Sequence, residues 1–164
     1  YCILGDIEDG NATALIYNSN IKNWHIKEDE LYRTAVSNTP KLLPVKIYEM
    51  SVLIKYVDTE EGRYSLDDPW CSNLYVLTNK SRINGAAGIM YEGVLKKLAD
   101  KLESDMYILP SSIHEVIILP KSTMFNKEEL MAMVRDVNTE GVSKDEVLSY
   151  TVYEYDRNTE EIYS

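Results

Sequence analysis

The stretch that decides the fold runs from residue 107 to residue 120 and reads Tyr-Ile-Leu-Pro-Ser-Ser-Ile-His-Glu-Val-Ile-Ile-Leu-Pro. Two apolar, β-prone runs, Tyr107–Leu109 and Val116–Leu119, enclose a short polar segment, and a proline closes each run. Apolar runs of this length on either side of a polar connection are typical of a β-hairpin. We therefore expect residues 106–119 to form a hairpin of core strands.

Further strands are expected on both sides of this hairpin. Asp9-Gly10 and Asn84-Gly85 are turn dipeptides that favour hairpins. The expected strands are residues 1–4, 12–17, 74–78, 86–90 and 152–155, the last followed by a turn at 156–159 that leads to residues 161–163. The first four of these ranges pair as two hairpins, across Asp9-Gly10 and across the loop that contains Asn84-Gly85.

Helices are expected between the hairpins, from apolar periodicity or from capping patterns. The predicted helices are residues 28–37, 45–57, 92–102, 126–137 and a short one that begins at Ser143. The clearest periodicity belongs to residues 92–102, where Leu98 lies on the apolar face and Lys97 does not. In the helix of residues 126–137, the side chains expected to be buried are Leu130, Met133, Val134 and Val137.

Hairpins separated by helices predict an α+β fold with a mostly antiparallel sheet and helices packed on it. With 164 residues the chain is long enough for one domain with a substantial core, and we expect residues 1–164 to form it. Residues 58–69 are acidic, contain Gly62 and end at Pro69, so a loop outside the core is expected there.

The charge of the chain excludes one class of partner. There are 27 acidic and 17 basic side chains, a net charge of −10, and the basic residues form no cluster. Nucleic acids are bound by clustered Lys and Arg, so we expect no nucleic-acid partner. No run approaches the ~18 apolar residues of a membrane span. Two cysteines outside any C-x-x-C pattern fit a reducing cytoplasm.

The chain also resembles a known family. The blocks that carry the resemblance are residues 30–40, 74–87, 107–120 and 146–157, which occur in order over nearly the whole chain. They are similar to an uncharacterised bacterial domain-of-unknown-function family, whose members occur mainly in gut-dwelling anaerobes. The resemblance implies that this chain is the C-terminal half of a longer protein. It implies no activity, ligand or catalytic residue.

The polar segment of the 107–120 hairpin contains the residue types of a serine hydrolase, namely Ser111, Ser112, His114 and Glu115. Consecutive residues of a strand point to opposite faces, so Glu115 is badly placed to orient His114. The segment also lacks the Gly-x-Ser-x-Gly elbow that exposes a nucleophile. We therefore favour a structural role, in which the serines cap a turn, over a binding role, and both over catalysis.

Other candidate sites are weaker. The histidines and cysteines have no metal-ligand spacing, so no metal and no cofactor is expected. Lys80 and Arg82 form a local positive site that could contact an anion. Thirteen tyrosines against one phenylalanine favour half-exposed rings, as at protein interfaces, and Tyr150, Tyr153 and Tyr155 concentrate this signal near the C-terminus.

These observations favour a non-enzymatic protein-interaction or scaffold module of the bacterial cytoplasm. Its expected partner is another protein, the missing N-terminal half, or a second copy of the chain. The alternative is a hydrolase-like enzyme centred on Ser112 and His114. A second acid that reaches His114 within a cleft would favour the enzyme.

Overall fold

The computed structural model describes residues 2–7, 10–50, 73–110, 112–123 and 125–164, and for residues 2–13 only the course of the backbone. The chain divides into two compact units, residues 1–39 and 40–164. Each unit is described by itself. The acidic stretch 58–69 and Ser111 lie outside the described residues.

The first unit contains a hairpin and two helices. Strands β1 (Cys2–Ile7) and β2 (Gly10–Ala14) pair in antiparallel register, which confirms the hairpin predicted across Asp9-Gly10. Helix α1 (Asn18–Trp24) follows, and α2 (Glu28–Leu42) continues past the end of the unit. The helix predicted over 28–37 is thus confirmed and is longer than expected. Three acidic residues in its first turn stabilise the helix through their interaction with the positive end of the helix dipole.

The second unit is built on a six-stranded sheet of described residues. Its strands are β3 (Val45–Glu49), β4 (Tyr75–Asn79), β5 (Met106–Leu109), β6 (Val116–Pro120), β7 (Tyr153–Tyr155) and β8 (Ile162–Tyr163). The order across the sheet is β3-β4-β6-β5-β7-β8, and every neighbouring pair is antiparallel. The predicted α+β class, the antiparallel sheet and the central β5–β6 hairpin are confirmed.

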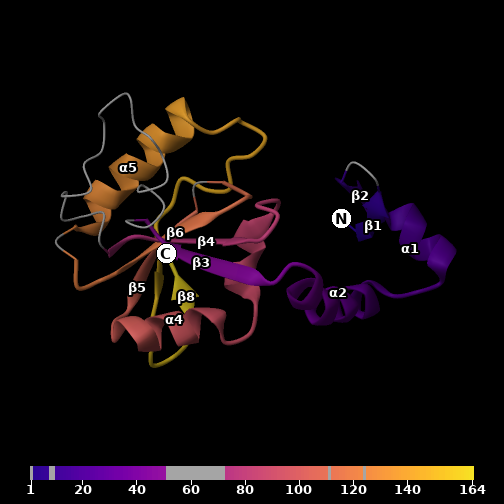
Figure 1. Ribbon diagram of the computed structural model, residues 1–164, viewed down its shortest axis with the longest axis horizontal. Coiled ribbons are helices and arrows are strands. Elements are labelled where there is room, and N and C mark those ends of the chain that lie inside the picture. Colours follow the sequence, from indigo (N-terminus) through magenta and orange to yellow (C-terminus); the bar gives the residue numbers. More distant parts are fainter. Residues whose placement is uncertain (1, 8–9, 51–72, 111, 124) are drawn as a thin grey trace. The chain divides into compact units, whose positions relative to one another are not determined.

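Helices cover both faces of this sheet. Helix α4 (Val94–Leu102) lies on one side and α5 (Lys127–Glu140) on the other, as Figure 1 shows. Because neighbouring side chains of a strand point to opposite faces, each inner strand supplies residues to two separate cores. In β5, for example, Met106 and Ile108 pack on the α4 side, while Leu109 packs on the α5 side.

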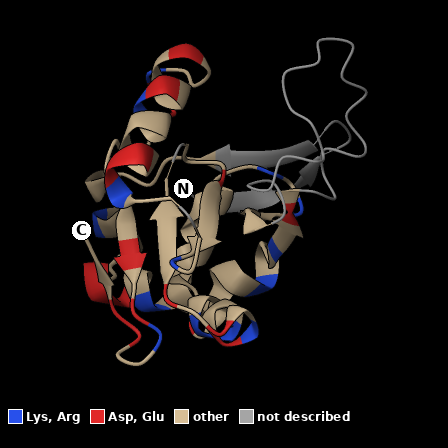
Figure 2. Ribbon diagram, turned by 90° about the vertical axis from the view of Figure 1, so that its left-hand side faces the viewer, with Lys and Arg blue, Asp and Glu red and all other residues tan. Residues whose placement is uncertain are grey.

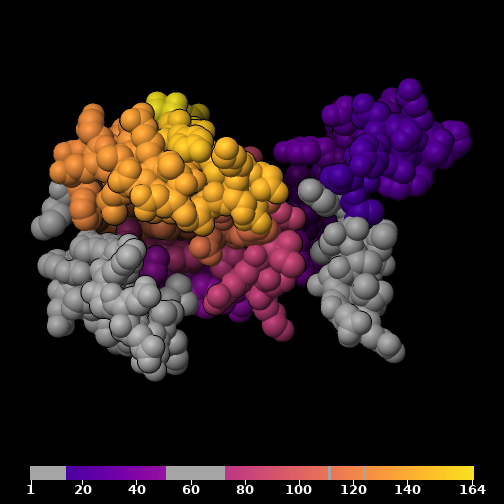
Figure 3. All heavy atoms as spheres, turned by 90° about the horizontal axis from the view of Figure 1, so that it is seen from above, coloured from indigo at the N-terminus to yellow at the C-terminus, as the bar shows by residue number. Residues whose placement is uncertain are grey.

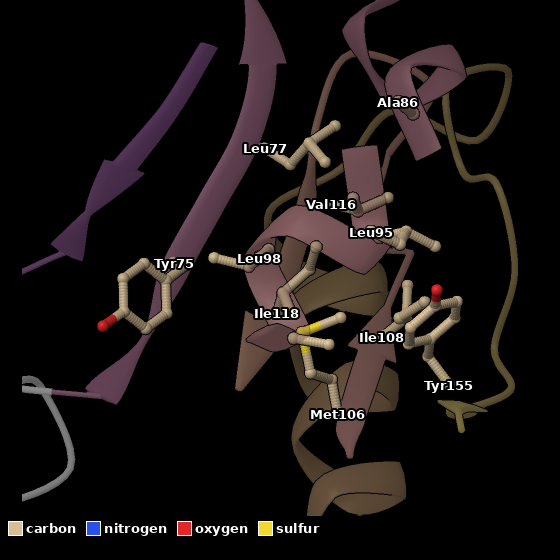
Figure 4. Packing of buried hydrophobic residues seen from close by; sticks show 11 residues of the cluster. Tyr75, Leu77, Ala86, Leu95, Leu98, Met106, Ile108, Val116, Ile118 and Tyr155 are labelled. Carbon is tan, nitrogen blue, oxygen red and sulfur yellow. The ribbon is translucent and has the colours of Figure 1, made fainter. Parts of the chain in front are cut away.

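The core between the sheet and α4 is the larger of the two (Figure 4). Its buried residues are Tyr75, Leu77, Ala86, Leu95, Leu98, Ala99, Met106, Ile108, Val116, Ile118 and Tyr155. The core on the α5 side consists of Leu74, Leu109, Leu119, Leu130, Val134 and Val152. Leu98 is buried and Lys97 is exposed, so the predicted face of α4 is confirmed.

Helix α5 starts where its capping pattern predicts. The Asn126 side chain accepts a hydrogen bond from the Glu129 amide at 2.9 Å, and the Glu129 carboxylate accepts one from the Asn126 amide at 3.0 Å. Of the four side chains predicted to be buried, Leu130 and Val134 are buried, and the prediction is wrong for the other two. Met133 and Val137 are exposed, and the side chain of Asn138 is buried instead, where it donates to the Ser149 carbonyl at 2.8 Å.

Three predicted elements are wrong. Residues 45–49 form strand β3 rather than a helix, because their backbone pairs with β4 and the alternate side chains of Val45 and Ile47 pack on the α4-side core. Residues 51–57 of that prediction lie outside the described residues. Gly85–Met90 forms a 3₁₀-helix, η2, rather than a strand. The short helix at Ser143 is a turn, in which the amides of Glu146 and Val147 donate to the Ser143 carbonyl.

A charged cluster joins the C-terminal strands to α5. Glu154 of β7 forms ion pairs with Lys121, which follows β6, and with Lys127 of α5, the latter at 2.8 Å. The ammonium of Lys121 also lies 5.5 Å from the ring centres of Tyr107 and Tyr163. Only 15% of the Glu154 side chain is exposed, so one carboxylate connects β6, β7 and α5 with little access to water.

Candidate functional site

The polar segment between β5 and β6 adopts a hydrogen-bonded turn. The hydroxyl oxygen of Ser112 accepts hydrogen bonds from the amides of His114, at 3.1 Å, and Glu115, at 3.3 Å. Ser112 is buried and forms a bridge to Val147 in the turn that follows α5. The contact is continued by the Ile113 amide, which donates to the Glu146 carbonyl at 2.9 Å. A serine hydroxyl that accepts hydrogen bonds from backbone amides in this way stabilises a turn.

His114 is held at both ring nitrogens. Its Nδ1 accepts the Asn84 amide at 3.2 Å, and its Nε2 lies 3.3 Å from Glu146 Oε1. An Nδ1 that accepts a hydrogen bond carries no proton, so this geometry places the proton of a neutral ring on Nε2, which donates to Glu146. The His114 carbonyl also accepts the Thr78 hydroxyl at 2.8 Å. His114 therefore connects three segments that are distant in the sequence.

Neither Asn84 nor Glu146 was expected from the sequence. Glu146 has a sequence signal, its three-residue spacing from Ser143, but that spacing predicts a helix cap rather than a partner for His114. Glu115, the acid next to His114 in the chain, is not its hydrogen-bonding partner in the structure. A distant acid thus takes the position beside His114. His114 and Glu115 lie in the turn before β6 rather than in a strand, so the strand alternation expected from the sequence does not apply to them.

This arrangement does not provide an activated serine. A nucleophilic serine has to donate its proton to a base within hydrogen-bonding distance. Here Ser112 Oγ is turned towards two backbone amides, and both nitrogens of His114 already have other partners. Catalysis would require the ring to leave Asn84 and the hydroxyl to leave its turn. The geometry matches the structural role favoured from the sequence.

The loop that carries Lys80 and Arg82 is internally hydrogen bonded. Asn79 is buried. Its side-chain nitrogen Nδ2 donates a hydrogen bond to the Ile83 backbone carbonyl, and its side-chain oxygen Oδ1 accepts one from the Ser81 hydroxyl, both at 2.8 Å. Lys80 and Arg82 themselves are exposed at the tip, and Arg82 has a left-handed backbone with φ of 55°. The loop is ordered by Asn79 rather than by its cations, and an anion contact there stays a prediction.

The three C-terminal tyrosines occupy different environments. Tyr150 is 50% exposed, and it belongs to the stretch after α5 that forms part of the surface in Figure 3. Tyr153 is half-buried, with its hydroxyl 3.5 Å from Ser149 Oγ. Tyr155 is 3% exposed and part of the core, where burial raises the pKa of its hydroxyl. Of the three, Tyr150 alone presents half of its surface to a partner.

A groove lies at the other end of the sheet, between β3 and α4. Its volume is about 620 Å³, and it is open to solvent. It is lined by Val45, Ile47, Tyr48, Glu49, Tyr75, Val94, Lys97, Leu98 and Lys101. In Figure 4, Tyr75 lies at the margin of the α4-side core, with its hydroxyl directed away from the other labelled side chains. The groove is thus an extension of the hydrophobic core that reaches the surface.

Charged groups border this apolar groove. The Lys101 ammonium lies 3.5 Å from Glu49 Oε1 and 5.7 Å from the centre of the Tyr75 ring. Lys97 lines the same groove, and its ammonium has no ion pair with any residue in the described part of the chain. The floor of the groove is therefore apolar, and its rim carries an excess of positive charge.

Beside the groove, strand β3 has a backbone edge directed away from the sheet. The Met50 amide donates to the Leu74 carbonyl at 2.8 Å, so these two residues form a hydrogen-bonded pair. Bonded and non-bonded pairs alternate along an antiparallel ladder. In the register of β3 and β4, Tyr48 and Lys46 are then the residues bonded to β4.

It follows that the backbone groups of Val45, Ile47 and Glu49 point away from β4. Within the parts of the chain that the structure describes, no strand pairs with β3 on that side. The side chains of the same three residues face the groove. Backbone donors and acceptors that pair with none of the described strands thus lie beside an apolar groove.

In the described ranges, no group of three or more His, Cys, Asp or Glu side chains is placed to hold a metal ion. The helices of those ranges include none that is long and apolar enough to cross a bilayer. On the face shown in Figure 2, acidic and basic residues are interspersed.

Comparison with protein families places the chain. Residues 1–157 match the family of unknown function DUF5688. The chain belongs to this family. The resemblance to a domain-of-unknown-function family is confirmed to that extent. No curated protein and no solved structure matches the chain significantly. For this DUF5688 member, function has to be argued from the groove and the polar turn themselves.

Proposed function

We propose that this DUF5688 member is a non-enzymatic protein-interaction module of a bacterial cytoplasmic protein, and that its partner docks at the groove between β3 and α4. One observation carries the proposal: an apolar groove of about 620 Å³ adjoins a strand edge whose backbone groups are unpaired among the described residues. Unpaired strand edges are sites of protein association, and natural sheets usually protect them.

The shape and chemistry of the groove favour a polypeptide over a small molecule. Small-molecule sites enclose most of their ligand and place a few polar groups around it. This groove is open, and it follows a strand and a helix. Its polar groups are backbone amides and carbonyls along one line, together with two lysines and Glu49 at the rim. A chain with its own backbone donors and acceptors complements that arrangement.

The location of the groove differs from the surface expected from the sequence. The 107–120 hairpin supplies β5 and β6, and both strands are paired on either side within the sheet. Tyr155 is committed to the core. We therefore propose the β3 margin, rather than the C-terminal tyrosines, as the docking surface. The partner is a separate protein or, equally within this proposal, the upstream part of a longer chain.

The proposal can be tested by crosslinking inside cells. A photoreactive benzoylphenylalanine at position 97 would face the groove, and one at position 135 would lie on the exposed surface of α5. Irradiation in cells of the source organism is expected to give one discrete adduct from position 97 and none from position 135. Mass spectrometry would identify the attached protein. Equal, diffuse labelling from both positions, or none from position 97, would contradict a docking site in the groove.

A hydrolase is the second candidate, because Glu146 lies 3.3 Å from His114 and so supplies the acid that a triad needs. The serine is the missing part. We expect the folded protein not to react with a fluorophosphonate probe, since Ser112 Oγ accepts two backbone amides. Intact-mass spectrometry checks this. Stoichiometric labelling of Ser111 or Ser112 that disappears in His114→Ala would establish the enzyme instead.

A further inference from the structure

We propose that the partner adds a strand to β3, and that this strand is an extended, antiparallel segment of another protein in which apolar and acidic residues alternate. This inference rests on the proposed function and adds the mode of binding and the chemistry of the partner. Its basis is the direction of the β3 backbone groups, the lining of the groove and Lys46, which forms no ion pair with the residues that the structure describes.

Strand addition follows from the backbone. Val45, Ile47 and Glu49 direct their amides and carbonyls to the margin of the sheet, at alternate positions along β3. This is the spacing with which an extended peptide pairs in β-strand addition. All five strand pairs of the sheet are antiparallel. A partner strand, called the guest below, would continue this pattern if it paired with β3 in antiparallel orientation.

The apolar half of the guest follows from the groove. In an antiparallel pair, directly opposed residues project on the same face. Guest residues opposite Val45 and Ile47 would therefore project into the groove, whose lining includes Val94 and Leu98 of α4. Those guest positions have to be apolar to match it. They are also the positions whose own amides and carbonyls bond to β3, because Val45 and Ile47 belong to pairs that are not bonded to β4.

The acidic half follows from charge. Lys46 is exposed and projects from β3 on the face opposite the groove, and Lys97 lies at the rim. Neither lysine forms an ion pair with the residues that the structure describes. Together with Lys101 and Glu49 they give three positive charges and one negative, +2 locally, on a chain with a net charge of −10. Guest residues between the apolar ones would project on the face opposite the groove, where Lys46 lies, so carboxylates at those positions would pair with Lys46, as opposite charges do across strands.

The test uses a synthetic peptide with the deduced pattern, acetyl-Glu-Val-Glu-Ile-Glu-Val-Glu-amide, and the full chain. Two variants of this peptide each carry three backbone N-methyl groups. In the first variant the methyl groups are on the two valines and the isoleucine, and in the second they are on the last three glutamates. Methylating the apolar residues removes the amides that face β3, so its binding should be weakened by about tenfold or more. Methylating the glutamates should have a much smaller effect. The comparison is matched, because both forms carry the same number of methyl groups.

A second pair of peptides tests the preference for acidic residues. A peptide with lysine in place of every glutamate should bind more weakly than the acidic one, although the chain as a whole would attract it. Lys46→Glu should reverse that order, whereas Lys144→Glu, in the exposed turn after α5, should not. Tighter binding of the lysine peptide to the unaltered chain would overturn the acidic partner.

Amide exchange followed by NMR decides whether the edge is free. In the isolated chain, the amides of Lys46 and Tyr48 should be protected and those of Val45, Ile47 and Glu49 should exchange fast. The peptide should protect the latter three. Their protection in the isolated monomer, or only on dimerisation, would assign the edge to the chain itself or to a second copy and would overturn the proposal. If position 97 crosslinks to a partner but both methylated peptides bind alike, strand addition fails while the docking groove stands.

Discussion

Replacing Gly85 with alanine is expected to destabilise the second unit by at least about 3 kcal/mol, the upper range for overpacked core positions. A Cβ at this position would lie 2.5 Å from the His114 carbonyl oxygen, 2.8 Å from the Asn79 amide nitrogen and closer still to the Thr78 hydroxyl. Two of these three atoms belong to the backbone of β4 and of the turn before β6, so they cannot rotate away. Urea denaturation of the variant and the unaltered chain measures the loss.

Gly88 provides the matched control, because it lies in the same 3₁₀-helix. A Cβ there would meet only side chains in close contact, Val45 Cγ2 at 2.7 Å and Leu77 Cδ2 at 2.9 Å. Side chains can adjust by changing rotamer, so Gly88→Ala should cost less than Gly85→Ala. An equal or larger loss for Gly88→Ala would mean that the approach of η2 to the His114 carbonyl does not limit stability.

The second large effect is expected at Glu154. Glu154→Gln removes the carboxylate charge that pairs with both Lys121 and Lys127, and it should lower the free energy of unfolding by about 1–3 kcal/mol, between the values for exposed and for buried ion pairs. The hydrogen bond from Lys121, and then that from Lys127, hold the pKa of Glu154 below its ordinary value of 4.5. Burial alone would lower the pKa of Lys121, but hydrogen bonds to Glu154 and Tyr163 raise it to about 12.

These shifts define the pH window of the effect. The pKa of Glu154 is lower in the folded state, so its stabilisation is complete above pH 4.5 and is lost as the pH falls through the folded value. The pKa of Lys121 is higher in the folded state, so its stabilisation is complete below 10.5 and is lost as the pH rises towards 12. The difference between the unaltered chain and Glu154→Gln should therefore be constant between about pH 6 and 9 and shrink outside that range.

Asp100 is the matched control for Glu154, since it also accepts hydrogen bonds from two cations, Lys96 and Arg157. Its side chain is 44% exposed, against 15% for Glu154. Water screens exposed pairs, so Asp100→Asn should lower the free energy of unfolding much less. Thermal unfolding at several pH values compares the two variants. Equal losses would show that burial of Glu154 contributes little.

The candidate site could be predicted only in part, and Glu146 shows why. The sequence places Ser112 and His114 together, and Glu115 is not the hydrogen-bonding partner of the histidine, although both residues lie in a turn rather than in the strand that was expected. The actual acid lies 32 residues further along the chain. No local pattern relates the two, because their meeting depends on how the turn after α5 returns to the sheet. The groove was likewise unpredicted, since it requires β3 and α4 to lie at one margin.

By itself, the sequence determined the elements whose signals are local. The β5–β6 hairpin follows from two apolar runs, α5 begins at Asn126 because its cap needs only Glu129, and Leu98 is buried because of helical periodicity. Each of these depends on neighbours within a few residues. From these elements and their order, the sequence also predicted the α+β class and the antiparallel sheet.

Only the tertiary structure decided the elements whose local signals are ambiguous. Residues 45–49 are apolar enough for a helix or a strand, and pairing with β4 makes them a strand. Gly85 is typical of a turn, yet it is required by the close approach of Thr78, in β4, and of His114, in the turn before β6. Both outcomes depend on long-range packing, which outweighs local propensity wherever that propensity is weak.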